Sequence, residues 1–154
     1  MSRAEAVYPR ILVAVDESPA GQAALDEAIR LTKNQHAQLR IVHVLQSVAS
    51  DGDETSERAM DAALAQAARL ILDRAAARAI EHGIAAISAL IEEGRGPISD
   101  AILADALQWD ARLIVMGTSG PHRLGRLQLG SVAEGVIHTA PVPVLLVRQP
   151  SVAA

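Results

Sequence analysis

The sequence predicts an α/β fold, an open doubly wound five-stranded parallel sheet covered by four helices. Short apolar runs rich in branched residues alternate with stretches of helical period, which is the pattern of βαβ units. Three of the runs are unbroken apolar blocks, as expected of strands buried on both faces of a sheet. The chain has 154 residues, half of them hydrophobic, with one Trp, one Tyr and no Phe. We therefore expect an aliphatic core in a single domain over 1–154, ordered over about 8–149.

Local signals place the first strand and helix. The apolar run 11–15 predicts a strand, and Ser18, a favoured N-cap, predicts a helix start with Pro19 at its first position. We expect this helix to end near Asn34. Its core-facing side is formed by Leu25, Ala28, Ile29 and Thr32. The other strands are predicted at 39–45, 84–91, 113–116 and 144–147.

The later helices are predicted from spacing and from capping residues. An acidic stretch over 47–57 is interpreted as a solvated loop, and Gly83 is placed to close the helix that follows. That helix is indicated by apolar residues at three- and four-residue spacing, namely Met60, Ala63, Leu64, Ala67, Ile71 and Ala75. Pro97 is expected to open the third helix. Ser131 is expected to begin the fourth, with Glu134 completing a Ser-x-x-Glu capping box.

Composition and charge exclude several classes of function. The formal net charge is -4, and the arginines are scattered, so the chain lacks the basic patch that binds nucleic acid or an anionic membrane. The absence of cysteine excludes a disulfide framework, thiolate catalysis and a cysteine-ligated metal. No signal peptide and no apolar run near the ~20 residues of a membrane span is visible. The expected location is the cytoplasm.

Glycines and a serine after the fourth strand predict a phosphate site. Gly117 and Gly120 are followed, after nine residues, by Gly130 and Ser131, where a helical stretch starting with Val132 begins. Glycine lets backbone amides approach an anion, and a helix N-terminus offers unpaired donors with a favourable dipole. The alternative is that the glycines only turn the chain and that Ser131 only caps its helix.

Charged residues near this motif supply further candidate contacts. Open doubly wound sheets bind ligands beyond the carboxyl ends of their strands, where Asp16 would accept a hydrogen bond from a ribose hydroxyl. The alternative is a plain loop carboxylate. Arg123 and Arg126 lie inside the glycine loop and would pair with phosphate oxygens, unless they are solvated surface arginines. His43 and His122 are candidate bases, but no partner residue forms a triad spacing with them. We therefore assign no catalytic residue and expect slow hydrolysis at most.

With these residues in view, the chain resembles the universal stress protein family along nearly its whole length. The likeness lies in the runs 11–16 and 143–147, in Val44 and Met116, and most specifically in the Gly-x2-Gly-x9-Gly-(Ser/Thr) motif. In that family the motif marks the ATP-binding branch. The resemblance implies a Rossmann-like fold of the adenine nucleotide alpha hydrolase type and ATP as the ligand, with Mg²⁺ bridging its phosphates. It also implies a homodimer joined through the last strand, Val144–Val147.

The resemblance further implies a role for each site residue. Asp16 would contact the ribose and adenine side, and Val44 would meet the adenine through its backbone. Met116 and Gly117 would line the base and the sugar. Backbone amides and one hydroxyl would meet the phosphates, and they belong to Gly120, Gly130, Ser131 and Val132.

Together these observations favour an ATP-binding regulator of a stress response that acts by a nucleotide-dependent change of state. Two alternatives stay open. One is a nucleotide-cleaving enzyme or slow ATPase on the same sheet, although relatives of that class carry a Ser-Gly-Gly-x-Asp-Ser loop where this chain has the run 16–19, Asp-Glu-Ser-Pro. The other is a ligand-free dimeric scaffold whose glycines are structural.

Overall fold

The computed structural model describes residues 5–46, 54–93, 96–119 and 129–149. Within them lie nine elements: β1 (Arg10–Ala14), α1 (Pro19–Gln35), β2 (Gln38–Gln46), α2 (Glu54–Glu81), β3 (Ile87–Glu93), α3 (Ile98–Trp109), β4 (Leu113–Gly117), α4 (Ser131–Thr139) and β5 (Val144–Val147). The five strands form one fully parallel sheet in the order β3-β2-β1-β4-β5. The predicted fold class is confirmed.

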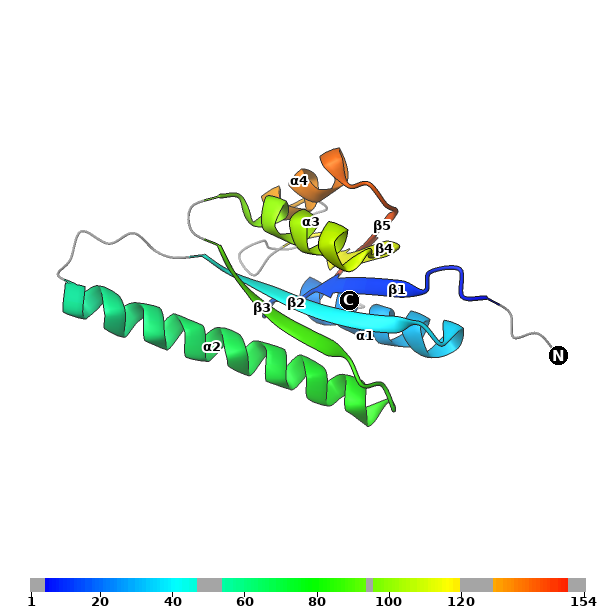
Figure 1. Cartoon of the computed structure of the whole chain (residues 1–154), viewed down its shortest axis with the longest axis horizontal. Helices are drawn as coiled ribbons and strands as arrows, with labels where there is room; N and C mark the ends of the chain where they lie inside the picture. Colours follow the sequence, from blue (N-terminus) through cyan, green and yellow to red (C-terminus); the bar gives the residue numbers. More distant parts are fainter. Residues whose placement is uncertain (1–4, 47–53, 94–95, 120–128, 150–154) are drawn as a thin grey trace, which may run out of the picture.

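The helices cover the two faces of the sheet in pairs (Figure 1). Successive side chains of a strand point to opposite faces, so each central strand contributes to two cores. The core under α1 and α2 contains Ile11, Val13 and Ile41. The core under α3 and α4 contains Leu12 and Val42. All five side chains are fully buried.

The direction of winding reverses between β1 and β4. From β1 the chain moves outward through β2 to the edge strand β3, and α3 then carries it back across the sheet to β4 and β5. The connection after β1 leads to α1 on one face, whereas the connection after β4 leads to α4 on the other. Neighbouring strands that send their chains apart in this way open a crevice at their carboxyl ends.

The start of α1 confirms the sequence signals. Ser18 is the N-cap, its hydroxyl oxygen accepts a hydrogen bond from the Gly21 amide at 2.9 Å, and Pro19 is the first helical residue. The helix continues to Gln35, one residue beyond the expected end near Asn34, and closes on His36 in the left-handed conformation with φ 55°.

The third strand begins later than predicted. β3 starts at Ile87, whereas the apolar run suggested a strand over 84–91. The reason lies in the end of α2, where Gly83 adopts φ +79° and the Ile84 amide donates to the Ala79 carbonyl at 2.9 Å. Residue 84 therefore belongs to the C-terminal cap of the helix, which Gly83 closes as expected.

The second helix differs from the prediction in its start and in its buried face. α2 begins at Glu54, inside the stretch interpreted as a loop, and none of its residues over 54–67 is buried. Met60, expected on the core face, is 55% exposed. The first half of α2 extends past the carboxyl edge of the sheet (Figure 1), so no strand lies beneath its apolar positions. The residues it buries are Ala68, Leu72, Ala75 and Ala79. No described helix, α2 included, is long and apolar enough to cross a membrane.

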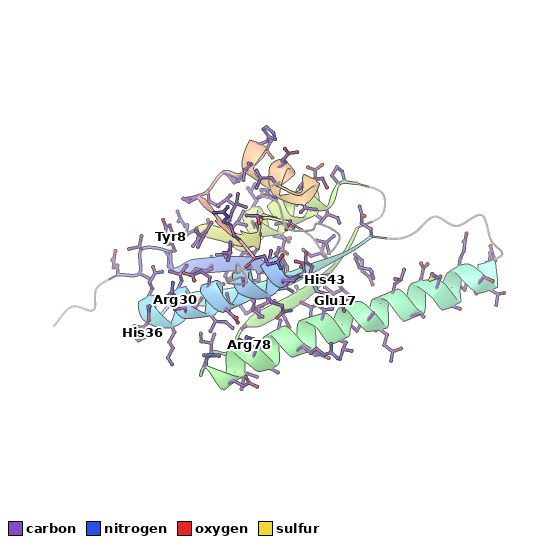
Figure 2. The ribbon with its side chains drawn as sticks, turned by 180° about the vertical axis from the view of Figure 1, so that it is seen from behind. Tyr8, Glu17, Arg30, His36, His43 and Arg78 are labelled. Atoms are coloured by element: carbon purple, nitrogen blue, oxygen red, sulfur yellow. The ribbon has the colours of Figure 1, made fainter. Side chains whose placement is uncertain are left out.

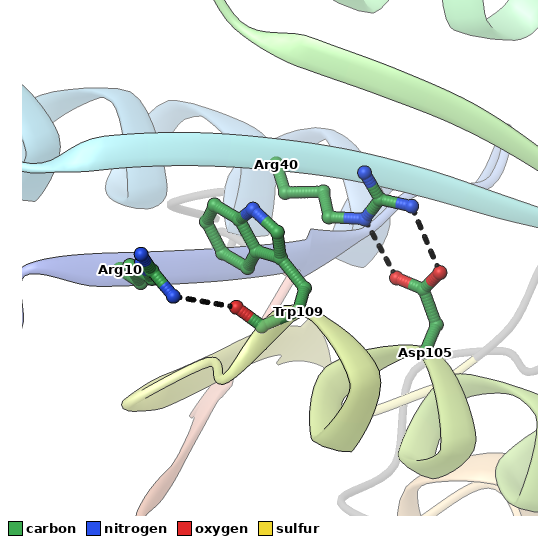
Figure 3. Close-up of polar contacts among 4 residues, drawn as sticks. All are labelled: Arg10, Arg40, Asp105 and Trp109. Atoms are coloured by element: carbon green, nitrogen blue, oxygen red, sulfur yellow. Dashed lines mark hydrogen bonds and ion pairs between the residues drawn. The ribbon is translucent and has the colours of Figure 1, made fainter.

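A polar cluster fixes the far end of α3 to the amino edge of the sheet (Figure 3). Arg40 of β2 donates to both carboxylate oxygens of Asp105, at 2.7 and 2.9 Å, and these hydrogen bonds raise the pKa of the Arg40 guanidinium. The Trp109 ring lies between two guanidinium groups, those of Arg10 and Arg40, each 6.0 Å from its centre. Arg10 also donates to the Trp109 carbonyl at 3.0 Å. These contacts hold α3 at the end opposite to the crevice.

Candidate functional site

The crevice holds a cavity of about 260 Å³ at the carboxyl ends of β1, β2 and β4. The first turns of α3 and α4 border it on one face of the sheet. Its lining is mostly apolar, with Asp16 as the single formally charged side chain among the described residues. The cavity is lined by Ala14, Val15, Asp16, Val42, His43, Val44, Ile98, Ile102, Met116, Gly117, Thr118, Ser119, Gly130, Ser131, Val132 and Ala133.

The structure brings seven of the ten predicted site residues to this cavity. Three strand ends and one helix start contribute them: Asp16, Val44, Met116, Gly117, Gly130, Ser131 and Val132. The other three, Gly120, Arg123 and Arg126, lie outside the described residues, as does His122. Residues more than 100 positions apart in the sequence therefore meet at one point.

The start of α4 has no side-chain cap. Gly130 is the N-cap with φ −67° and ψ 161°, and its carbonyl accepts the first helical hydrogen bond from the Glu134 amide at 3.0 Å. Among the described residues, nothing accepts from the amides of Ser131, Val132 and Ala133. Four residues of this turn line the cavity, so the unpaired N–H groups and the positive end of the helix dipole lie at its wall.

The predicted capping box at α4 is wrong. Ser131 is the first helical residue and not the N-cap, so its hydroxyl lies one position too far along the chain to accept from the third helical amide. The cap position is occupied by Gly130, whose own amide donates to the Thr118 carbonyl at 2.8 Å. That hydrogen bond ties the start of α4 to the residue after β4, and both residues line the cavity.

Asp16 has a structural role as well as a place at the cavity. Its Oδ1 accepts hydrogen bonds from both the backbone amide of Ser18, at 2.9 Å, and the Ser18 hydroxyl. All side-chain hydrogen bonds of Asp16 within the described residues use Oδ1. The half-buried carboxylate thus stabilises the start of α1 through one oxygen, and Oδ2 has no partner there.

Gly117 is a glycine for packing reasons that the motif did not reveal. A Cβ at this position would lie 2.7 Å from the backbone carbon of Ala20 and 2.9 Å from the amide nitrogen of Gly21. The end of β4 therefore packs directly on the backbone of α1. A side chain at Gly117 would push the strand away from the helix and change the wall of the cavity.

His43 lines the cavity, and its ring is held by a backbone carbonyl. Its Nδ1 lies 2.7 Å from the carbonyl oxygen of Val15, and because a carbonyl only accepts, Nδ1 carries the proton. Val42 and Val44 pack on the α3 and α4 face, so strand alternation directs the His43 side chain to the other face. Figure 2, drawn from behind, shows His43 at the end of the sheet where α1 begins.

Several residues that line the cavity were not predicted from the sequence as part of the site. Ile98 and Ile102 stand at positions expected to face the core, and they pack there, but both also line the cavity. Thr118 and Ser119 were passed over as the variable positions of the glycine motif. The apolar face of α3 was the available signal, since it continues into the first turn.

The model of the universal stress protein family matches residues 8–148. A universal stress protein of Thermus aquaticus, encoded beside a QAH/OAS sulfhydrylase gene, is 36% identical over 143 residues, which are 92% of this chain and all of that protein.

Solved structures of universal stress proteins are similar to this chain over nearly its whole length. The universal stress protein UspA of Lactobacillus plantarum superposes with a TM-score of 0.80 at 26% identity, over 95% of this chain and 100% of that one. A universal stress protein in complex with cAMP gives a TM-score of 0.69 at 26% identity, covering 93% and 99%. One from Archaeoglobus fulgidus in complex with dAMP gives 0.61 at 26% identity, covering 92% and 98%.

Proposed function

We propose that this chain, which belongs to the universal stress protein family, binds an adenine nucleotide in the cavity at the carboxyl edge of its sheet. The physiological ligand in this proposal is ATP with Mg²⁺, and the protein is a stress-response regulator that changes state with its nucleotide. The observation that carries the proposal is the start of α4, where three amides that have no acceptor within the described part of the chain border a cavity. A helix start of this kind is suited to a phosphate.

The polarity of the cavity supports one orientation of the nucleotide. The phosphates would lie against the uncapped turn at Gly130, Ser131 and Val132. The negative charge of Asp16 would repel phosphate but accept a hydrogen bond from a ribose hydroxyl, so the ribose belongs on its side. The base would then lie against the apolar wall at Val44 and Met116. In this proposal Gly120, Arg123 and Arg126 complete the phosphate site.

The hydrogen bonds at the start of α4 would supply enough free energy to bind a nucleotide with micromolar affinity. A hydrogen bond to a charged group contributes about 1.5–3 kcal/mol, and three amides of one helical turn would supply much of the ~8 kcal/mol that a micromolar dissociation constant represents. The helix dipole adds only about 0.3–2 kcal/mol. The directional hydrogen bonds, rather than the dipole, would carry the affinity.

The structures of relatives support an adenine nucleotide as the class of ligand. Two similar proteins were solved in complex with cAMP and with dAMP. Both ligands contain adenine, a sugar and one phosphate, and these are the three parts that the apolar wall, Asp16 and the start of α4 would accept here. Whether this chain takes ATP, ADP or a cyclic nucleotide is decided by binding measurements on the three ligands.

Slow turnover is part of the proposal. General acid and base groups typically supply factors of 10²–10⁴ in rate. The Nδ1 of His43 donates to the Val15 carbonyl, and strand alternation directs its side chain to the face opposite α3 and α4, so we assign it no role as a base for hydrolysis. The proposed function is therefore nucleotide binding rather than catalysis. We further propose that the protein acts in the cytoplasm. Multiple turnovers per second that disappear in His122→Ala would replace this function by that of an ATPase.

We also propose a homodimer joined through β5. This strand lies at the edge of the sheet and follows Pro141 and Pro143, and all four of its residues are only half-buried. An apolar edge strand of this kind tends to pair with another chain. Sedimentation should give a dimer at micromolar concentration, and Leu145→Asp should shift it to a monomer. A monomeric wild type, or a dimer that survives the substitution, would contradict this.

The binding proposal is tested by native mass spectrometry of protein purified from cells, followed by calorimetry with ATP and Mg²⁺. We expect a copurified adenine nucleotide or a micromolar dissociation constant. A protein that carries no nucleotide and shows no heat with ATP, ADP or cAMP would be the ligand-free scaffold instead.

A further inference from the structure

Ser18 lies at the centre of a buried polar junction that joins α1 to both sides of the cavity. Only 1% of the residue is exposed. We propose that Ser18 is a positioning residue for nucleotide recognition, and that it fixes the carboxylate of Asp16 so that the site discriminates in favour of a nucleotide with ribose hydroxyls. This inference rests on the proposed function.

The contacts of Ser18 hold one oxygen of Asp16 from two directions. The backbone amide of Ser18 and its hydroxyl both donate to Oδ1. The hydroxyl oxygen in turn accepts from the Gly21 amide at 2.9 Å, so the first turn of α1 orients the hydroxyl. With Oδ1 held by two donors, the carboxylate is restricted in rotation. Oδ2 remains as the oxygen that a ribose hydroxyl can use.

Gly21 shows that the junction is built for this carboxylate. A Cβ on Gly21 would lie 2.2 Å from Oδ1 of Asp16 and 3.1 Å from Oγ of Ser18. Glycine inside a helix lowers stability relative to alanine, and an ordinary N-cap needs only the hydroxyl of Ser18 and the amide that it accepts from. The absence of a side chain at Gly21 therefore leaves room for the Asp16 carboxylate. Capping of the helix by Ser18 alone would not need that room.

The same hydroxyl reaches the other side of the cavity. The Ser119 carbonyl lies 3.3 Å from Oγ of Ser18, a second acceptor for a hydroxyl that has one proton. The neighbouring carbonyl, that of Thr118, accepts from the Gly130 amide at 2.8 Å. Ser18 thus contacts the carboxylate of Asp16 and the backbone two residues beyond the end of β4. A ligand that fills both sides binds to groups held at one junction.

The expected effect of Ser18 is on selectivity for the sugar. In the wild type the Oδ2 acceptor is oriented in advance, so a ribose hydroxyl forms its hydrogen bond without loss of carboxylate freedom. In Ser18→Ala, Asp16 loses one of the two donors on Oδ1 and its carboxylate can rotate. The hydrogen bond to the ribose hydroxyl then weakens, while contacts to the base and the phosphates persist.

The experiment compares binding of ATP with that of 2′,3′-dideoxy-ATP by calorimetry with Mg²⁺. The dideoxy compound is used because a similar protein was solved with dAMP, which lacks only the 2′ hydroxyl. We expect the wild type to prefer ATP by roughly 10- to 100-fold. The preference should fall to about threefold or less in Ser18→Ala, as in Asp16→Asn. Ser18→Thr, which keeps a hydroxyl and an N-cap, should restore it.

A control separates positioning from simple loss of helix stability. Ala23→Gly lowers the stability of the same helix by a similar amount without touching Asp16, and its preference for ATP should equal that of the wild type. A full wild-type preference in Ser18→Ala, or an equal loss in Ala23→Gly, would overturn the inference. A wild type that binds both compounds equally would also overturn it and leave nucleotide binding intact. A wild type that binds neither would overturn the proposed function.

Discussion

Both α1 and α4 begin at the carboxyl edge of this sheet, and their first turns are capped in opposite ways. At α1 the Ser18 hydroxyl accepts the Gly21 amide, Pro19 has no amide to satisfy, and Gly117 of β4 packs against the turn. At α4 the cap is Gly130, and three amides at the cavity wall find no acceptor among the residues that the structure describes. A helix start that is closed by its own side chains stabilises the fold. A helix start without such a cap has backbone N–H groups that can donate hydrogen bonds to a ligand.

Closing α4 in the way that α1 is closed should give the largest effect. Gly130→Asp places a carboxylate at the N-cap, where it would accept from the free amides and repel phosphate. Because φ is −67° and ψ is 161° at Gly130, the backbone admits the side chain without strain. We expect the affinity for ATP to fall by at least about 100-fold, with unfolding stability equal to or above that of the wild type.

The control for this change is Thr139→Asp, which adds the same charge to the exposed far end of α4. Calorimetry should show wild-type affinity in the control. Circular dichroism should show a folded protein in both variants. Wild-type affinity in Gly130→Asp would remove the phosphate role from α4.

A cluster far from both helix starts should affect stability alone. In Asp105→Ala the guanidinium of Arg40, whose side chain is only 19% exposed, loses two hydrogen bonds. The free energy of unfolding in urea should fall by about 1–3 kcal/mol. ATP affinity should not change, because none of the four residues of the cluster lines the cavity.

The matched control is Arg30→Ala, which breaks an ion pair with Glu27 on the surface of α1. The Arg30 side chain is 69% exposed, so the loss of stability should stay below about 0.5 kcal/mol. Equal losses for the two variants would show that the burial of the Arg40 pair adds nothing.

Removing the cap of α1 should reduce stability by a smaller amount. Ser18→Ala deletes a buried hydroxyl that accepts one amide of the first turn and donates to Asp16. The expected loss is about 1 kcal/mol, measured by urea unfolding. A loss near zero would mean that water replaces the hydroxyl, and α1 would then not be the closed helix start of the comparison.

The serine that begins α4 should give the smallest effect. Ser131→Ala removes an exposed hydroxyl that caps nothing, so stability should stay within about 0.5 kcal/mol of the wild type. Calorimetry should show a loss of ATP affinity of roughly three- to tenfold, since the backbone amide remains. A stability loss as large as that of Ser18→Ala would indicate that the two helix starts are equivalent.

The comparison also explains which features the sequence could predict. Strand runs and the Ser18 cap depend on neighbouring residues, so local patterns identified the sheet and the start of α1. The predicted buried face of α2 was wrong for its first half. Met60 has the spacing of a core residue, but this part of the helix lies beyond the sheet that would cover it. The capping box at Ser131 was wrong by one position, since only the backbone angles show that Gly130 is the cap.

The sequence predicted which residues form the candidate site, but it did not predict the contacts among them. The glycine motif and the strand ends pointed to residues that the fold brings to one cavity. The packing of Gly117 on Ala20, and the hold of Ser18 on Asp16, depend on contacts between elements that no local pattern encodes. Predicting them requires the register of β1 beside β4.

We propose that the open start of α4, and not the closed start of α1, binds the phosphates. The most direct test records backbone amide resonances during titration with ATP and, separately, with adenosine. We expect the amides of Ser131, Val132 and Ala133 to shift with ATP and not with adenosine, and those of Ala20 and Gly21 to show no such difference. Phosphate-dependent shifts of equal size at both helix starts, or their absence from α4, would contradict it.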